Sequence, residues 1–205
     1  MLKKDILLII NPNASKGHGA RKARSIGSYF RSLGRQCTIA YTNGEGHARS
    51  LAERGAGYGY RTIVAAGGDG TVNEVLNGIM RSGKNKDIMM GLIPIGRGND
   101  FAWAAGIPKD PWKAAKLIAN GTAKPCDVGF VLGGDSSDGM YFLNGAGIGF
   151  EAIVNFKAAD YRRLNGMPSY IAAFLYTIFH VPKAYQVHLE VDDQVFALQT
   201  QQISV

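Results

Sequence analysis

Residues 65–79 read AAGGDGTVNEVLNGI, in which three glycines and one aspartate separate two strongly patterned segments. The run before them, RTIVAA (61–66), is apolar and typical of a buried strand. The residues after them carry apolar side chains at helical spacing, at Val72, Val75, Leu76 and Ile79. The stretch therefore predicts a strand, a tight glycine loop and a helix.

The same unit occurs four times in the first half of the chain. The other apolar runs are DILLII (5–10), CTIAYT (37–42) and IMMGLIPI (88–95), and each leads into a Gly/Asn-rich loop. Helical patterns follow: one with Ala23, Ile26, Phe30 and Leu33 on one face, one over 48–54, and short ones reaching about Asn120. Apolar strands that alternate with helices predict an α/β fold with a parallel sheet.

The pattern changes after Gly121. CDVGFVLG and GMYFLNGAGIG resemble strands around a turn, the aromatic-rich segment 161–181 is typical of a helix, and the last residues alternate around Asp192-Asp193 like a hairpin. We therefore expect an α/β domain over 1–121 and a second, antiparallel β-rich domain over 122–205. The chain stops inside an alternating segment, which leads us to expect a longer protein in which this second domain continues.

Composition limits the functional classes. The chain has 205 residues, a net charge of +7 and a pI near 9.4, which suit a phosphorylated ligand, an anionic membrane surface or nucleic acid. No nucleic-acid-binding motif accompanies the charge, so a nucleic-acid partner is not expected. Two cysteines without metal-ligand spacing favour a cytoplasmic location, and the longest apolar stretch (170–181) is too short to cross a bilayer.

The glycine loop has the chemistry of a phosphate site. A helix that begins at such a loop offers unpaired N–H groups and partial positive charge to an anion. Gly67, Gly68 and Gly70 would let the backbone approach an oxygen closely and would permit positive φ. Thr71 and Glu74 have the spacing of a capping box, so Thr71 is expected to start the helix. Asp69 is a candidate magnesium ligand, directly or through water, or a general base; the alternative is a tight turn with a solvated carboxylate.

Two further loops should reach the same edge of a parallel sheet. Residues 11–19 and 96–100 are rich in Gly and Asn, and the first of them carries Lys16, His18 and Arg21. The spacing fits neither GxxxxGK[ST] nor GxGxxG, so the pattern predicts a phosphate site of another design.

These motifs are familiar together. NPNASKG, GGDGTVNEVLNG and IPIGRGNDFA, in this order, resemble the diacylglycerol kinase catalytic-domain family, and most closely its bacterial soluble lipid kinases. The resemblance implies a Rossmann-like nucleotide-binding domain, then a β-sandwich domain, with the active site in the cleft between them. It implies transfer of the γ-phosphoryl group of ATP to a lipid hydroxyl with Mg²⁺. It also places a general base and part of the magnesium site beyond Val205.

The resemblance also implies a set of site residues. Those assigned to ATP are Asn11, Pro12, Asn13, Ala14, Ser15, Thr42, Gly67, Gly68, Asp69, Gly70, Thr71, Val72 and Asn73. Arg97 stands where the family commonly has threonine, and it either adds a cation near the phosphates or points to solvent. Asp127 matches an acidic position near the cleft, or forms a salt bridge at a strand edge. Lys16, Glu74, Asn99 and Asp100 are further cleft residues without an assigned role, and His47 is interpreted as a helix-start residue.

Alternative functions remain open at the level of sequence. An NAD kinase shares GGDGT-like chemistry, although NPNAS and GRGNDFA favour a lipid substrate. A nucleotide-binding module without turnover would keep the same loops. For a lipid kinase we expect reversible contact with anionic membranes through Arg162 and Arg163 and the aromatics Tyr170, Phe174, Tyr176 and Phe179, which alternatively pack in a core. The lipid is not identified, and the oligomeric state is open, a homo-oligomer included.

Overall fold

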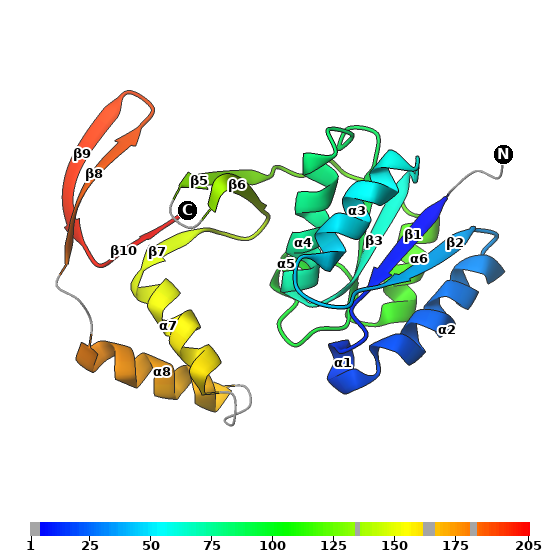
Figure 1. Ribbon diagram of the computed structural model, residues 1–205, viewed down its shortest axis with the longest axis horizontal. Coiled ribbons are helices and arrows are strands. Elements are labelled where there is room, and N and C mark those ends of the chain that lie inside the picture. Colours follow the sequence, from blue (N-terminus) through cyan, green and yellow to red (C-terminus); the bar gives the residue numbers. More distant parts are fainter. Residues whose placement is uncertain (1–4, 134–135, 162–166, 181–183) are drawn as a thin grey trace. The chain divides into compact units, whose positions relative to one another are not determined.

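The computed structural model describes residues 5–133, 136–161, 167–180 and 184–205 (Figure 1). The chain divides into two compact units, Met1–Asn144 and Gly145–Val205. Each unit has its own secondary structure and is described separately below.

The first unit contains a four-stranded parallel sheet with the order β2-β1-β3-β4 (Figure 1). Its strands are β1 (Ile6–Ile10), β2 (Cys37–Tyr41), β3 (Thr62–Gly67) and β4 (Met89–Pro94). All three pairings are parallel, and residues 6–10 of β1 are paired on both sides. The four predicted strands and the parallel sheet are therefore confirmed.

Helices cover both faces of this sheet. They are α1 (Ala14–Gly17), α2 (Gly19–Ser32), α3 (His47–Gly57), α4 (Asp69–Arg81), α5 (Asp100–Ala104) and α6 (Pro111–Asn120). Alternate side chains of β1 point to opposite faces, as the two-residue period of a strand requires. Ile6, Leu8 and Ile10 pack in a core with residues of α2 and α6, whereas Leu7 and Ile9 pack with residues of α3 and α4.

One ion pair ties the ends of three elements together. Arg35, in the loop between α2 and β2, donates from Nε and Nη2 to the two carboxylate oxygens of Asp5 at 2.5 and 2.7 Å. Its Nη1 donates to the carbonyl oxygen of Ala119 in the last turn of α6, at 2.6 Å. The hydrogen bond and the charge of Asp5 raise the pKa of Arg35 further above its ordinary value. The fork-shaped guanidinium thus holds the start of β1 against the end of α6.

The first unit ends with an antiparallel hairpin of β5 (Gly129–Gly133) and β6 (Ser136–Phe142). Its strand β6 contacts α4 through hydrogen bonds described below, which explains why the compact unit runs to Asn144. The expected division near residue 121 concerns functional domains and stays a prediction. Segment 122–128 forms no strand, so β5 begins three residues later than the run CDVGFVLG suggested.

The described residues of the second unit form two helices and two small sheets. Its elements are β7 (Gly147–Gly149), α7 (Phe150–Asp160), α8 (Met167–His180), β8 (Tyr185–Val191), β9 (Gln194–Thr200) and β10 (Gln202–Ser204). β8 and β9 form an antiparallel hairpin whose turn is Asp192-Asp193, as predicted, with Asp192 at φ 52°. The helix expected over 161–181 is found over 167–180, and residues 162–166 and 181 lie outside the described part. Helix α7 was not expected.

Within the described residues, no helix combines the length and the apolar character that crossing a bilayer requires.

Candidate nucleotide site

The loops of the first unit meet at the carboxyl edge of the parallel sheet. Backbone hydrogen bonds continue the strand pairing into them: Asn11 N donates to Ala66 O, and Thr42 N donates to Ile10 O. Ile95 N donates to Gly67 O in the same way. The ends of all four strands are therefore in register where the loops begin, which is where α/β folds bind their ligands.

The glycines of GGDG serve two different purposes. A Cβ added to Gly67 would lie 2.4 Å from the hydroxyl of Thr71, and one added to Gly96 would lie 2.2 Å from the Cα of Gly68. Gly67 is thus needed because the first turn of α4 folds back over it, whereas Gly68 and Gly96 are needed because the two loops pack against each other. At Gly70 an added Cβ would meet nothing within 4 Å. The expectation of positive φ at these three loop glycines is wrong, since none of Gly67, Gly68 and Gly70 adopts it.

Asp69 links the glycine loop to the loop after β4. Its Oδ2 accepts a hydrogen bond from the backbone N–H of Asn99, and its Oδ1 accepts one from that of Asp100, each at 2.8 Å. Asn99 itself has a left-handed backbone with φ 64° and exchanges two side-chain hydrogen bonds with the backbone of Gly96. Asp69 is half-buried, and both of its carboxylate oxygens accept hydrogen bonds from the neighbouring loop. This does not match the alternative interpretation, a turn carboxylate surrounded by solvent.

The capping-box interpretation of Thr71 and Glu74 is wrong. Helix α4 begins at Asp69, after Gly68 as its N-cap, so Thr71 already lies inside the first turn. Glu74 instead reaches a neighbouring helix, where its Oε2 accepts a hydrogen bond from the N–H of Ala48 at 2.9 Å. Because the N-cap residue of α3, Gly46, has no side chain to offer, Glu74 satisfies one of the free N–H groups at the start of α3.

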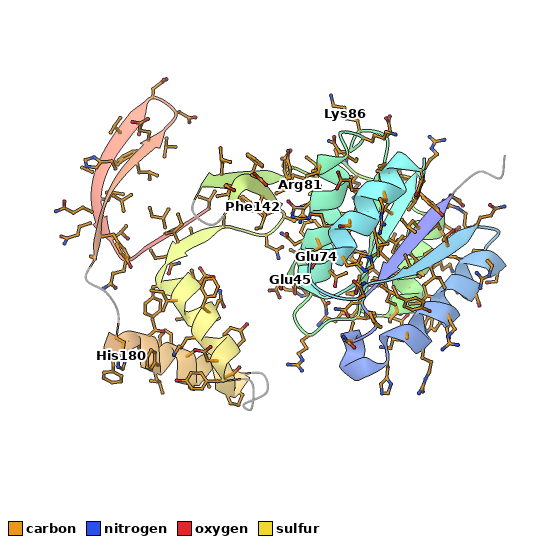
Figure 2. All side chains as sticks on the ribbon, in the orientation of Figure 1. Glu45, Glu74, Arg81, Lys86, Phe142 and His180 are labelled. Atoms are coloured by element: carbon orange, nitrogen blue, oxygen red, sulfur yellow. The ribbon has the colours of Figure 1, made fainter. Side chains whose placement is uncertain are left out.

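A cavity of about 510 Å³ opens at this edge. It lies among the loops after β1 and β2 and the first turns of α3 and α4, with two carboxylates in its lining, Glu45 and Glu74 (Figure 2). Its lining consists of Asn11, Pro12, Asn13, Thr42, Asn43, Gly44, Glu45, Ala48, Gly70, Thr71 and Glu74. Seven of these residues belong to the set named from the sequence.

The other named residues lie elsewhere or outside the description. Gly67, Gly68, Asp69, Asn99 and Asp100 form the contact between the two loops. Ala14 and Val72 begin or continue helices without lining the cavity. The side chains of Ser15 and Lys16 lie outside those that the structure describes. Arg97 and Asp127 are exposed.

Two residues have partners that the sequence did not indicate. Asn73 donates to the carbonyl oxygen of Tyr141 on β6 at 3.2 Å and does not line the cavity. The Nδ1 atom of His47 accepts a hydrogen bond from the N–H of Asn43 at 3.0 Å, which braces a loop that lines the cavity. His47 is also the first residue of α3, as expected.

The loop after β2 is the part of the cavity that sequence reasoning missed. Asn43, Gly44 and Glu45 line it, together with Ala48. The signal was present, because the loop after CTIAYT reaches the same edge as the others in a parallel sheet. Only Thr42 was chosen from it.

Comparison with known proteins places the loops of this site within one protein family. Residues 5–131 match the model of the diacylglycerol kinase catalytic domain. A curated protein of Pseudomonas aeruginosa named "Probable lipid kinase YegS-like" is 34% identical over 172 residues, which cover 83% of this chain and 53% of that protein. The "Diacylglycerol kinase" of Bacillus subtilis is 32% identical over 192 residues, 92% of this chain and 60% of that protein.

A solved structure shares the fold along the whole chain. The crystal structure of a diacylglycerol kinase from Bacillus anthracis str. Sterne superposes with a TM-score of 0.72 at 28% sequence identity. The match covers 100% of this chain and 64% of that one. The chain spans little more than half the length of the curated relatives described above.

Proposed function

Because this chain belongs to the diacylglycerol kinase catalytic domain family, we propose that the protein is a lipid kinase that transfers the γ-phosphoryl group of ATP to a lipid hydroxyl such as that of diacylglycerol. The observation that carries the proposal is that one carboxylate, Asp69, links the GGDG and GRGND loops beside a cavity of about 510 Å³. Phosphoryl transfer depends on positioning and on charge stabilisation, and both would be supplied by such preorganised loops.

ATP would divide between two parts of the site. The described lining of the cavity is polar and holds carboxylates but no cation, which suits the uncharged nucleoside. The triphosphate would lie over the start of α4, where Gly70 leaves the backbone uncovered and where a helix offers N–H groups that have no partner within it. Arg97, which is exposed on the neighbouring loop, would add a fixed positive charge beside the phosphates.

The residues present fit a magnesium ion that is shared with phosphates. A Cβ added to Gly98 would lie 2.8 Å from Oδ2 of Asp69 and 3.3 Å from Oδ1 of Asp100, so two carboxylates border one small space that glycine leaves open. Mg²⁺ typically binds one or two carboxylates together with substrate phosphates, and it neutralises charge on the transferring group. No group of three or more His, Cys, Asp or Glu residues that could hold a metal is present among the described residues, so Asp69 and Asp100 would hold the ion with the nucleotide.

Asp69 is proposed as the central functional residue of this chain. Each of its oxygens uses one lone pair on a backbone N–H and keeps another for a ligand. Asp127 and Lys16 are proposed as further cleft residues. A cytoplasmic protein that visits anionic membranes reversibly would reach its lipid substrate.

Transfer of label from γ-labelled ATP tests the proposal. Full-length protein is incubated with vesicles containing diacylglycerol, phosphatidylglycerol or sphingosine, and with NAD as a competing acceptor. We expect label in a lipid. Label in NAD alone would identify an NAD kinase, and tight ATP binding without transfer to any acceptor would identify a binding module.

A glycine pair tests the location of the phosphates. Gly70→Ala adds a methyl group to open space and should fold normally, but it should weaken ATP binding about tenfold if phosphates approach the bare backbone. Gly57→Ala is the matched control, because its Cβ also meets open space but lies in α3 outside the cavity lining. Equal ATP affinities in the two variants would contradict the placement of the phosphates at the start of α4.

A further inference from the structure

Three polar side chains form a stripe along α4. Asn73, Asn77 and Arg81 are spaced four residues apart, so they share one face of the helix. All three donate hydrogen bonds to the backbone of β6 (Figure 2 labels Arg81). We call these three residues the α4 stripe.

Asn77 pairs with β6 as a neighbouring strand would. Its Oδ1 accepts a hydrogen bond from Tyr141 N, and its Nδ2 donates to Tyr141 O, both at 2.9 Å. The residue is only 5% exposed, so an unpaired amide at this position would be costly. A buried side chain that satisfies both backbone groups of one residue fixes that residue in place.

The other members extend this contact. Asn73 donates to Tyr141 O at 3.2 Å and accepts from Nδ2 of Asn77 at 3.0 Å. Arg81 donates from Nη2 to the carbonyl oxygen of Gly139 at 3.0 Å. The same Nη2 donates more weakly to the carbonyl oxygen of Asp138 at 3.5 Å, so the stripe holds β6 at Tyr141 and at the neighbouring residues Asp138 and Gly139.

Strand β6, which the stripe holds, pairs with β5, and Asp127 lies just before β5 in the chain. Tyr141 pairs with Phe130 across the β5–β6 ladder, and their rings are 4.8 Å apart. Asp127 is three residues before Phe130, a distance that the chain spans in at most about 10 Å. The place of the Asp127 carboxylate therefore depends on where β6 is fixed.

The same helix carries the candidate nucleotide site. Gly70, Thr71 and Glu74 line the cavity from the first turns of α4, and Asp69 bonds the neighbouring loop. One rigid helix thus joins the glycine loop to the hairpin that follows Asp127.

We propose that Asn77 is a positioning residue: through the α4 stripe it sets the place of Asp127 relative to the glycine loop, and so acts on phosphoryl transfer without touching the nucleotide. The inference rests on the proposed function and on the cleft role proposed for Asp127. Removing the contact should lower kcat and leave ATP binding unchanged.

A double-mutant cycle on the full-length protein tests the coupling. We expect Asn77→Ala to lower kcat about tenfold with the KM for ATP changed less than about twofold. In an Asp127→Ala background the same substitution should have little further effect, because the group that Asn77 positions is gone. Arg81→Ala removes the bonds from Nη2 to the carbonyl oxygens of Asp138 and Gly139 and leaves the bonds to Tyr141 intact. The side chain is exposed, so this variant should fold, with a smaller kcat loss that also disappears in the Asp127→Ala background.

Val75→Ala is the matched control for stability. Val75 is fully buried on α4 and packs in the core, so its truncation weakens the helix without removing a bond to β6. A kcat loss in Asn77→Ala no larger than in Val75→Ala would overturn the inference. It would also be overturned if the fold-reduction of kcat in the Asn77→Ala/Asp127→Ala double variant equalled the product of the two single reductions, because the residues would then act independently. Absence of lipid phosphorylation by the unmodified protein is a separate result, which would overturn the proposed function and this inference with it.

Discussion

Asp69 has a structural role and a proposed catalytic role at the same atoms. Its two oxygens each accept a backbone N–H from the start of α5, which draws the GRGND loop against the GGDG loop. The carboxylate that would face a phosphate-bound ion is therefore also the group that shapes the site. A substitution at this residue should disturb both roles.

We predict that Asp69→Asn lowers phosphoryl transfer by about two to four orders of magnitude, the range for losing a positioned acid or base or a key electrostatic group. The amide also has to turn an N–H toward one of the two backbone donors, which opens the loop contact. Initial rates of lipid phosphorylation measure the effect.

Asp110→Asn is the matched control for Asp69. Oδ1 of Asp110 also accepts two backbone N–H groups, those of Trp112 and Lys113, but at the start of α6. We expect little loss of stability, because Asn caps a helix about as well as Asp and its amide oxygen can still accept both N–H groups, and we expect the rate of the enzyme to be unchanged. Similar rates in the two variants would return Asp69 to a purely structural role.

Cys37 gives a prediction about pH. Burial raises the pKa of its thiol to about 11, and Arg31 opposes this shift only in part. Since the thiolate is the reactive form, roughly one Cys37 thiol in a thousand is reactive at pH 8. Alkylation of Cys37 by iodoacetamide should therefore be slow at pH 8 and rise about tenfold per pH unit up to pH 10.

Peptide mass spectrometry can follow Cys37 and Cys126 in the same sample. Cys126 is exposed and serves as the internal reference. Alkylation of Cys37 at pH 8 as fast as that of Cys126 would contradict the raised pKa of this partly buried thiol.

At the scale of elements, α3 and α4 depend on each other. The start of α3 lacks a capping side chain of its own and uses Glu74 of α4 instead. We predict that Glu74→Ala lowers the free energy of unfolding by about 0.5–2 kcal/mol, as other lost caps do, and that Glu74→Gln retains most of it because the amide keeps an acceptor oxygen. Denaturant titration measures both.

Glu53→Ala is a control on the exposed side of α3. Its effect on stability should stay within about 0.5 kcal/mol, as is usual for surface sites. If Glu74→Ala cost no more than this, the hydrogen bond to Ala48 would contribute nothing to folding.

Glu74 also marks where prediction from sequence ended. Local patterns were enough for the four strands, because apolar runs such as ILLII are buried on both faces, and for the turn at Asp192-Asp193. The Thr71/Glu74 spacing suggested a local cap, but the partner of Glu74 is 26 residues away in sequence. Spacing along one helix carries no information about which neighbouring helix lies within reach.

The candidate site shows the same limit. The loops could be placed at one edge, because parallel strands end together, and seven named residues line the cavity. Asn73 was assigned to ATP by resemblance, yet its side chain donates a hydrogen bond to the carbonyl oxygen of Tyr141, on a strand that comes later in the chain. Helix α7 was missed because its apolar residues lack a clear one-sided pattern.

At the scale of the whole molecule, the net charge and the exposed aromatic side chains suggest which part of the protein would bind a membrane. The net charge is +7, and on α8 the side chains of Tyr170 and Phe179 are 51% and 80% exposed. Arg162 and Arg163, which we expected to assist them, lie outside the described residues.

We predict that full-length protein floats with liposomes to an extent that rises with the fraction of anionic lipid and falls as salt is raised, since salt screens charges at a surface. Phe179→Ala should weaken flotation, with Phe156→Ala, an equally exposed aromatic on α7, as the comparison. Flotation that does not change with salt would contradict an electrostatic contribution to binding. A protein that does not float with any liposomes would contradict membrane contact altogether.

The central place of β1 has a consequence during translation. β1 is synthesised before either of its partners, yet it lies between β2 and β3 with all five of its side chains buried. About fifty residues separate Ile10 from Thr62, so at roughly 5–20 residues per second the sequence ILLII stays without its second neighbour for several seconds. We expect this segment of the nascent chain to be a binding site for ribosome-associated chaperones, released once β3 has emerged. Site-specific crosslinking of stalled nascent chains of increasing length would show contact at β1 that ends after β3 leaves the ribosome.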